Sequence, residues 1–230
     1  MIRAIALDID GTITDQNRRL DVSAVGAIRK AEDSGITVCL ATGNMLCFAK
    51  TTSVLLGTSG PLLAEDGGVI FDQKTEETCV LDDKSDELKK GIELLEERFG
   101  KIQHTSSSLR RQTGRALEKT FDLKEASELF RENGLNIAII DSGFAFHIKD
   151  PAVNKGKALK KIASILEIST SEIAAIGDAQ NDIEMLKSAG VSFAPANACS
   201  EAKEVSTHIT KNAHGKGVKE AIGFILQKKE

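Results

Sequence analysis

The sequence predicts an α/β protein with a doubly wound, Rossmann-like parallel-sheet core and an inserted α+β domain. Short apolar segments alternate with amphipathic helical segments in the first third of the chain and again in the last third. The block between them has the order helix, two strands, helix, two strands, which is not a doubly wound order. Polar residues follow several of the apolar segments directly, and ligands bind at the carboxyl ends of strands in open parallel sheets.

The first part of the core begins with residues 2–7, which are almost wholly apolar and end at acidic residues. This pattern is typical of a strand buried on both faces. A helix is expected from its N-cap Asp21 to Gly35, where a helix commonly stops. A strand is expected next at 36–41, followed by a helix at 45–56 and a strand at 61–64. A turn at 66–68 then leads into a short strand at 69–71.

The middle block is predicted to fold as a separate αββαββ unit. A helix over 85–100 places Leu88, Ile92 and Leu95 on one stripe. Asp122 with Glu125 resembles a capping box that starts a second helix, which ends at 133–134. The expected strands lie around 101–105 and 109–118, and in a hairpin of 136–140 and 144–148 across a turn at 141–143.

The core alternation resumes at Asn154 and runs to a last helix that ends near Leu226. A helix carrying Ala158 and Ile162 comes first. A strand at 173–176, a helix at 182–189 and a strand at 191–194 are expected to follow it. We therefore predict a discontinuous core of residues 1–82 and 152–230 with an inserted domain of residues 83–151.

The composition excludes several partners. The net charge of −4 comes from 30 basic and 34 acidic residues spread along the chain, which gives no reason to expect nucleic acid or an anionic membrane as a partner. No Trp or Tyr is available as a stacking platform. The four dispersed cysteines and the absence of a signal-like start or a long apolar run predict a cytoplasmic protein with reduced thiols. Monomer and homodimer stay open.

Four polar motifs lie at or beside the expected strand ends. Each has an ordinary interpretation when taken alone: a turn, a helix N-cap, a solvated lysine and a polar turn. Their convergence at one edge of a parallel sheet is what these interpretations do not predict. The motifs are Asp8-Ile9-Asp10-Gly11-Thr12, Thr42-Gly43-Asn44, Lys155 and Gly177-Asp178-Ala179-Gln180-Asn181-Asp182.

Together the motifs supply what phosphoryl transfer requires. Carboxylates of Asp8 and Asp178 can share a hard cation such as Mg²⁺, which prefers oxygen ligands. One carboxylate can act as a nucleophile and split a difficult displacement into two easier ones. Lys155, Thr42 and the loop of Gly11 and Thr12 can meet the charge on the phosphoryl oxygens.

The chain thereby resembles the haloacid dehalogenase superfamily of phosphatases over nearly its whole length. Asp8-x-Asp10-Gly11-Thr12 resembles the first motif of that family, Thr42 the second, Lys155 the third and Gly177-Asp178-x-x-Asn181-Asp182 the fourth. The αββαββ insert is similar to the cap of the subgroup that contains sugar phosphatases. Asn44 stands where many relatives have Arg.

The resemblance implies a role for each residue. Asp8 is the nucleophile, with a reference pKa of about 3.9 that keeps it ionised near neutral pH, and Asp10 is the general acid and base. The metal ligands are Asp8, the main-chain carbonyl of Asp10, Asp178, and Asp182 directly or through water. Asn181 orients the turn, and the phosphate is held by Thr12, Thr42, Gly43 and Lys155.

The implied substrate is a small phosphorylated metabolite, with 2-phosphoglycolate as the best single guess because length and cap size resemble archaeal-type phosphoglycolate phosphatases. A sugar phosphatase, a mutase-like transferase and a non-catalytic phospho-receiver module are the alternatives. The insert is expected to act as a substrate-specificity lid. Its Arg110, Arg111 and Arg115 could meet a second anion, although an ordinary solvated strand face is the favoured interpretation.

Overall fold

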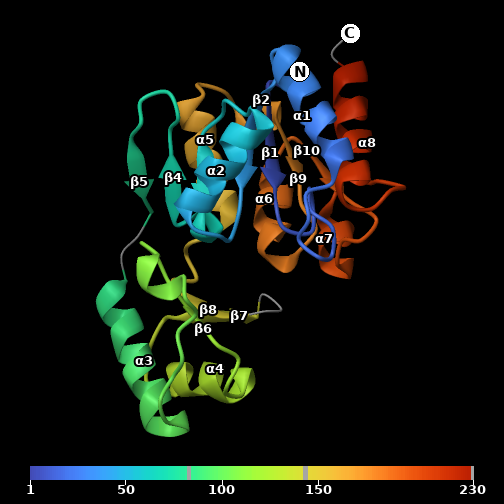
Figure 1. Ribbon diagram of the computed structural model, residues 1–230. Helices are drawn as coiled ribbons and strands as arrows, with labels where there is room; N and C mark the ends of the chain where they lie inside the picture. The colour runs from blue at the N-terminus through green and yellow to red at the C-terminus, as the bar shows by residue number, and fades with distance from the viewer. Residues whose placement is uncertain (82–83, 142–144, 229–230) are drawn as a thin grey trace. The chain divides into compact units, whose positions relative to one another are not determined.

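The computed structural model describes residues 1–81, 84–141 and 145–228. The chain divides into two compact units, one made of residues 1–79 and those from 154 onward, the other of Val80–Val153 (Figure 1). Each unit is described by itself. The boundary expected between residues 82 and 83 lies outside the described residues.

The first unit is built on one eight-stranded sheet with the order β11-β10-β9-β1-β2-β3-β4-β5. Strand β1 is central and pairs in parallel with β2 and β9, and β10 and β11 continue the parallel order outward. Strand β4 turns back, antiparallel to β3, across the turn after β3. The strands are β1 (Ala4–Asp8), β2 (Thr37–Ala41), β3 (Leu62–Ala64), β4 (Val69–Phe71), β5 (Thr78–Val80), β9 (Ile173–Ile176), β10 (Val191–Ala194) and β11 (His208–Ile209).

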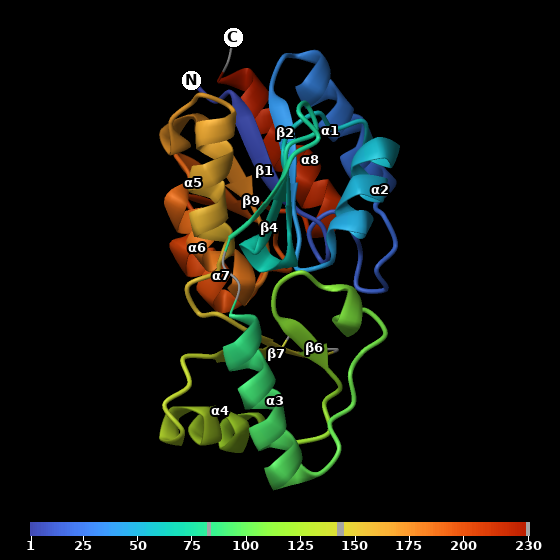
Figure 2. The same ribbon diagram turned by 90° about the vertical axis from the view of Figure 1, so that its left-hand side faces the viewer.

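Helices cover both faces of this sheet, as the doubly wound prediction requires. In Figures 1 and 2, α1, α2 and α8 lie on one face, and α5, α6 and α7 lie on the other. Asp21 caps α1 by accepting a hydrogen bond from the backbone N–H of Ser23, and Asn154 caps α5 in the same way through Lys157. The helices are α1 (Val22–Asp33), α2 (Leu46–Leu56), α5 (Lys155–Ile165), α6 (Ile183–Ser188), α7 (Ser200–Val205) and α8 (His214–Gln227).

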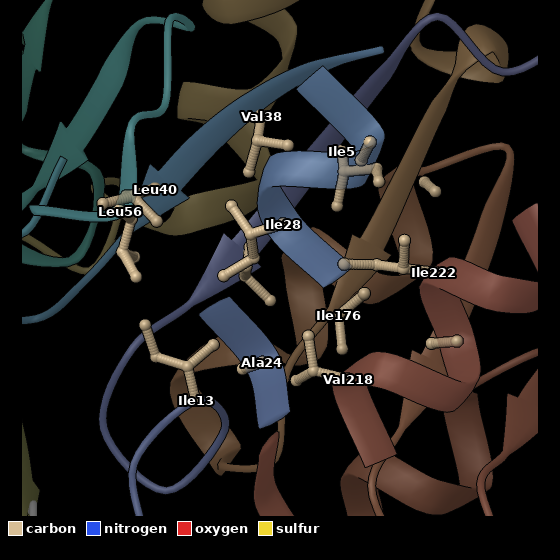
Figure 3. Packing of buried hydrophobic residues seen from close by; sticks show 14 of the residues in the cluster. Ile5, Ile13, Ala24, Ile28, Val38, Leu40, Leu56, Ile176, Val218 and Ile222 are labelled. Carbon is tan, nitrogen blue, oxygen red and sulfur yellow. The ribbon is translucent and has the colours of Figure 1, made fainter. Parts of the chain in front are cut away.

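The two faces of the central strands differ in side-chain size because successive residues of a strand point to opposite faces. Ile5, Val38 and Ile176 belong to the large apolar cluster shared with Ile28 of α1 and Ile222 of α8 (Figure 3). The alternate positions of the same strands are mostly small, namely Ala4, Ala6, Cys39, Ala41 and Ala175, all fully buried. The large side chains of the central strands therefore lie mostly beneath α1, α2 and α8.

The second unit contains a three-stranded antiparallel sheet with the order β6-β8-β7 and two helices. Its core joins Leu88 and Leu95 of α3 to Phe130 of α4 and Ile148 of β8. Asp122 caps α4 through the N–H of Glu125, as expected. The elements are α3 (Ser85–Phe99), β6 (Arg115–Leu117), α4 (Leu123–Glu132), β7 (Ala138–Asp141) and β8 (Phe146–Lys149).

Two of the strands expected in this unit are wrong in extent. Residues 101–105 keep only one bridge, His104 to Leu117. The expected strand over 109–118 shrinks to β6, because Ser108–Arg110 forms a 3₁₀ turn. The buried Ser108 hydroxyl accepts a hydrogen bond from the N–H of Ala116 and contacts His104, so a side chain takes the Ala116 N–H that a longer strand ladder would use. Of the turn expected at 141–143, Asp141 is the last residue of β7, and the other two residues lie outside the described residues.

No helix among the described residues is long and apolar enough to cross a membrane. All four cysteines are free thiols, as the sequence predicted.

Candidate active site

The carboxyl ends of β1, β2 and β9 bring three of the motifs to one edge of the sheet. Asp8 is the last residue of β1 and pairs in register with Ala41, the last residue of β2. Leu7 pairs with Ile176, the last residue of β9, so the turn that begins at Gly177 starts beside Asp8. Parallel pairing therefore places residues far apart in sequence next to one another.

A buried ionic cluster forms around Lys155, the first residue of α5. Its ammonium donates to Asp8 Oδ1 and to Asp182 Oδ1, at 2.6 Å each, and to the main-chain carbonyl of Ala41 at 3.2 Å. Lys155 and Asp182 are fully buried and Asp8 is 4% exposed. All three donor bonds of the ammonium are satisfied, which is what a buried charge requires.

The turn after β9 is held by Asp182. Its Oδ2 accepts hydrogen bonds from the backbone N–H groups of Asp178 and Ala179, at 3.0 Å each, while its Oδ1 faces Lys155. Asp178 Oδ1 accepts the hydroxyl of Thr12 at 2.6 Å. Gly11 has a φ of +85°, and a Cβ there would overlap the carboxylate of Asp178, so only glycine fits this approach. The first and fourth motifs therefore interlock.

Burial dominates the titration of these groups. Desolvation, followed by the charge of Asp182, raises the pKa of Asp8 well above its usual range, against the opposing pull of Lys155. The same two causes raise the pKa of Asp178 to about 6. Desolvation lowers the pKa of Lys155, but the charges of Asp182 and Asp8 outweigh it and the net shift is upward. Burial and the neighbouring carboxylate therefore place the pKa of Asp8 above the reference value, even with the Lys155 ammonium in contact.

The carboxylates fit a hard divalent cation. Oxygen atoms of Asp8, Asp178 and Asp182 all lie within 4.8 Å of one another, a spacing at which one ion can be held. Carboxylate oxygens are the ligands that such cations prefer. A cation among them would offset the repulsion that raises the pKa values of Asp8 and Asp178. The structure brings together the three carboxylates that were expected as metal ligands.

The carboxylate of Asp10, expected to act as general acid and base rather than as a metal ligand, has other partners. Asp10 Oδ1 accepts from the Nε and Nη2 of Arg18, at 3.0 and 2.9 Å. Asp10 Oδ2 accepts from the Nδ2 of Asn44 at 2.5 Å. Asn44, which replaces a cation in the resemblance, thus binds the expected general acid through its neutral amide.

The remaining expected phosphate ligands lie at the same edge. Thr42 follows β2, is fully buried, and accepts a hydrogen bond from the N–H of Asn44 through its hydroxyl. Gly43 lies so close to Asp66 that a Cβ on it would stand 2.9 Å from Asp66 Oδ1. Thr12, expected to bind phosphate, donates its hydroxyl to Asp178 in this structure.

Sequence reasoning missed Asp66. It is 5% exposed, has a φ of +59°, and follows Glu65, which has a φ of +53°. Its Oδ1 accepts from the Nδ2 of Asn181 at 2.8 Å, so it links the turn after β3 to the turn after β9. The sequence signal was a carboxylate after a third strand, which was interpreted only as a turn.

His214 and Asn197 were also missed. Nδ1 of His214 and Nδ2 of Asn197 both contact the main-chain carbonyl of Gly11, at 2.8 and 2.9 Å. Asn197 Oδ1 accepts the N–H of His214, which starts α8. These two side chains therefore anchor the loop after β1, and no spacing in the sequence relates them to Gly11.

The arginines of the second unit are placed on and around β6. Arg110 ends the 3₁₀ turn and is exposed. Arg111 Nε donates to the carbonyl of Thr113 at 3.3 Å, and Arg115 Nη1 donates to that of Gly114 at 2.6 Å. Only Arg115 belongs to a strand.

Comparisons with known proteins agree with this geometry. Residues 5–109 and 114–222 match the haloacid dehalogenase-like hydrolase family. A phosphoglycolate phosphatase of Methanothermobacter thermautotrophicus is 41% identical over 221 residues, 96% of this chain and 97% of that protein. One from Archaeoglobus fulgidus is 41% identical over 223 residues, covering 97% of this chain and 96% of the relative.

A solved structure gives the same fold. The crystal structure of Thermoplasma acidophilum 0175 superposes with a TM-score of 0.88 at 26% identity and covers 98% of this chain and 99% of that chain. The family match spans both halves of the core, including the segments that carry Asp8, Thr42, Lys155 and Asp178. The chain belongs to the haloacid dehalogenase-like hydrolases.

Proposed function

We propose that this chain is a metal-dependent phosphatase that hydrolyses a small phosphomonoester through an aspartyl phosphate on Asp8, with 2-phosphoglycolate as the substrate. The observation that carries the chemistry is the buried cluster in which Lys155 joins Asp8 to Asp182 beside Asp178. The relatives that are 41% identical over nearly the whole chain carry the choice of substrate. A sugar phosphate is the alternative substrate.

Asp8 would attack phosphorus and release the alcohol, and water would then hydrolyse the phospho-aspartate. Asp10 would give a proton to the leaving oxygen and take one from the attacking water. On its Oδ1 this transfer requires an Arg18 contact to open. Lys155 would hold Asp8 and a phosphoryl oxygen, and Thr42, Gly43 and Thr12 would line the phosphate position. Asn181 and Asp182 would fix the turn that carries Asp178.

Asp8, Asp178 and Asp182, with the main-chain carbonyl of Asp10, would hold the cation. We propose Mg²⁺, which supplies charge neutralisation for the phosphoryl group when bound. The lid role of residues 83–151, the cytoplasmic location, and the choice between monomer and homodimer stay predictions from the sequence.

The test is steady-state hydrolysis of p-nitrophenyl phosphate, 2-phosphoglycolate and hexose phosphates with Mg²⁺, with specificity constants compared. Asp8→Asn should lower turnover by about 10³-fold or more, because it removes the nucleophile. Asp33→Asn, an exposed acid at the end of α1, is the matched control. Turnover that survives in Asp8→Asn would overturn the mechanism. A stable phosphoprotein without phosphate release would favour a receiver module, and phosphorylated product would favour a transferase.

A further inference from the structure

Arg18 is the cation that touches the proposed general acid. It belongs to the loop between β1 and α1, has a φ of +60°, and its side chain is 51% exposed. Two of its nitrogens contact one oxygen of Asp10, and the amide of Asn44 holds the other oxygen. Both oxygens of Asp10 are therefore engaged by N–H donors.

Proton transfer through Asp10 Oδ1 requires an Arg18 contact to open, because its two lone pairs face two Arg18 nitrogens. Asn44 is held in place, because its N–H bonds Thr42 and its carbonyl accepts from Glu65. Arg18 extends from a more exposed loop on a long side chain, so the Arg18 contact is the one that can open at lower cost.

A guanidinium that leaves Asp10 can pair with another anion beside that residue. Lys155, which also contacts this group of carboxylates, is fully buried and already bound to Asp8 and Asp182. A guanidinium presents a planar fork of donors that matches a carboxylate. A substrate whose leaving group carries a carboxylate can supply that anion close to the leaving oxygen.

We propose that Arg18 selects phosphomonoesters with a carboxylate on the leaving group, by exchanging Asp10 for the substrate carboxylate. This inference rests on the proposed phosphatase function and names the recognition element for its substrate. The exchange also frees Asp10 Oδ1 for proton transfer, so it couples recognition of the substrate to readiness of the acid.

The test compares 2-phosphoglycolate with 2-hydroxyethyl phosphate, in which a neutral hydroxymethyl group replaces the carboxylate. Arg18→Gln should lower kcat/KM for 2-phosphoglycolate about 10-fold to 100-fold more than for the neutral ester, which is the loss expected for one hydrogen bond to a charged group. Arg18→Lys should restore part of the difference. Arg19→Gln is the matched control, because Arg19 is adjacent but pairs with Asp15.

Equal losses for both esters in Arg18→Gln would overturn the inference, since Arg18 would then serve the phosphoryl group or the loop. A similar selective loss in Arg19→Gln would also overturn it. Either result would leave the phosphatase function intact if the wild-type protein still hydrolyses both esters. Failure of the wild-type protein to hydrolyse any phosphomonoester would overturn the proposed function and this inference with it.

Discussion

Two clusters of the core unit are almost equally buried, but burial affects the free energy of folding in opposite directions in the two. The apolar cluster beneath α1 and α8, with Ile5, Ile28 and Ile222, gains free energy in proportion to the apolar area it removes from water. The ionic cluster of Lys155, Asp8 and Asp182 is equally buried. Removing its charges from water costs free energy, which the attraction between the charges must offset. The comparison teaches that burial provides stability in one cluster and reactivity in the other.

The largest effect should come from removing the central cation. Lys155→Met leaves Asp8 and Asp182 as uncompensated buried carboxylates, so we expect unfolding free energy to fall by about 3–5 kcal/mol and turnover to fall by about 10²-fold or more. Urea unfolding and phosphate release measure the two losses. Lys157→Met, an exposed position on the same helix, is the control. Equal stability of the two variants would mean that the ionic cluster contributes nothing to the fold.

The next effect should be confined to stability. Ile28→Ala leaves a cavity in the apolar cluster, and we expect a loss of about 2–5 kcal/mol in unfolding free energy with kcat unchanged. Val22→Ala on the same helix is the control, because Val22 is 80% exposed. A large fall in kcat for Ile28→Ala at a temperature where it stays folded would show that the two clusters are coupled.

A smaller effect is expected on metal binding as pH changes. The pKa of Asp178 is raised to about 6, so below that pH the ion must displace a proton and Mg²⁺ affinity should fall by up to about tenfold per pH unit. Without the ion, a raised carboxyl pKa favours folding below the unfolded value of about 3.9, and this contribution is lost as pH rises through about 6. Calorimetric titration measures the affinity. An Mg²⁺ affinity that does not change with pH in this range would contradict the prediction. Asp178→Asn should reduce the pH dependence of the affinity.

The smallest effect should come from Asp66. Asp66→Ala removes the acceptor for Asn181, a hydrogen bond of about 1 kcal/mol, so we expect kcat/KM to fall by about fivefold to tenfold. Asp72→Ala, in the turn after β4, is the control because its carboxylate bonds only its own turn among the contacts described. If both variants behave alike, the link between the two turns is not needed for catalysis.

The core was the more predictable of the two units. Each strand that precedes a motif is a mostly apolar run. The N-caps of helices α1 and α5, Asp21 and Asn154, are local signals that the structure confirms. The second unit was predicted less well. There the Ser108 hydroxyl accepts the N–H of Ala116, which lies eight positions further along the chain. A hydrophobic pattern gives no signal of such a side-chain contact.

The sequence by itself determined which side chains stand at the ends of the parallel strands. The reason is that apolar segments such as residues 2–7 and 173–176 predict buried strands, and the residues that follow them in the chain are then known. The tertiary structure alone decided that Arg18 and Asn44 hold Asp10, that Asp66 holds Asn181, and that His214 anchors Gly11. Those contacts depend on turns with positive φ and on partners up to 203 positions apart. Such contacts exist only after the sheet has brought its loops to one edge.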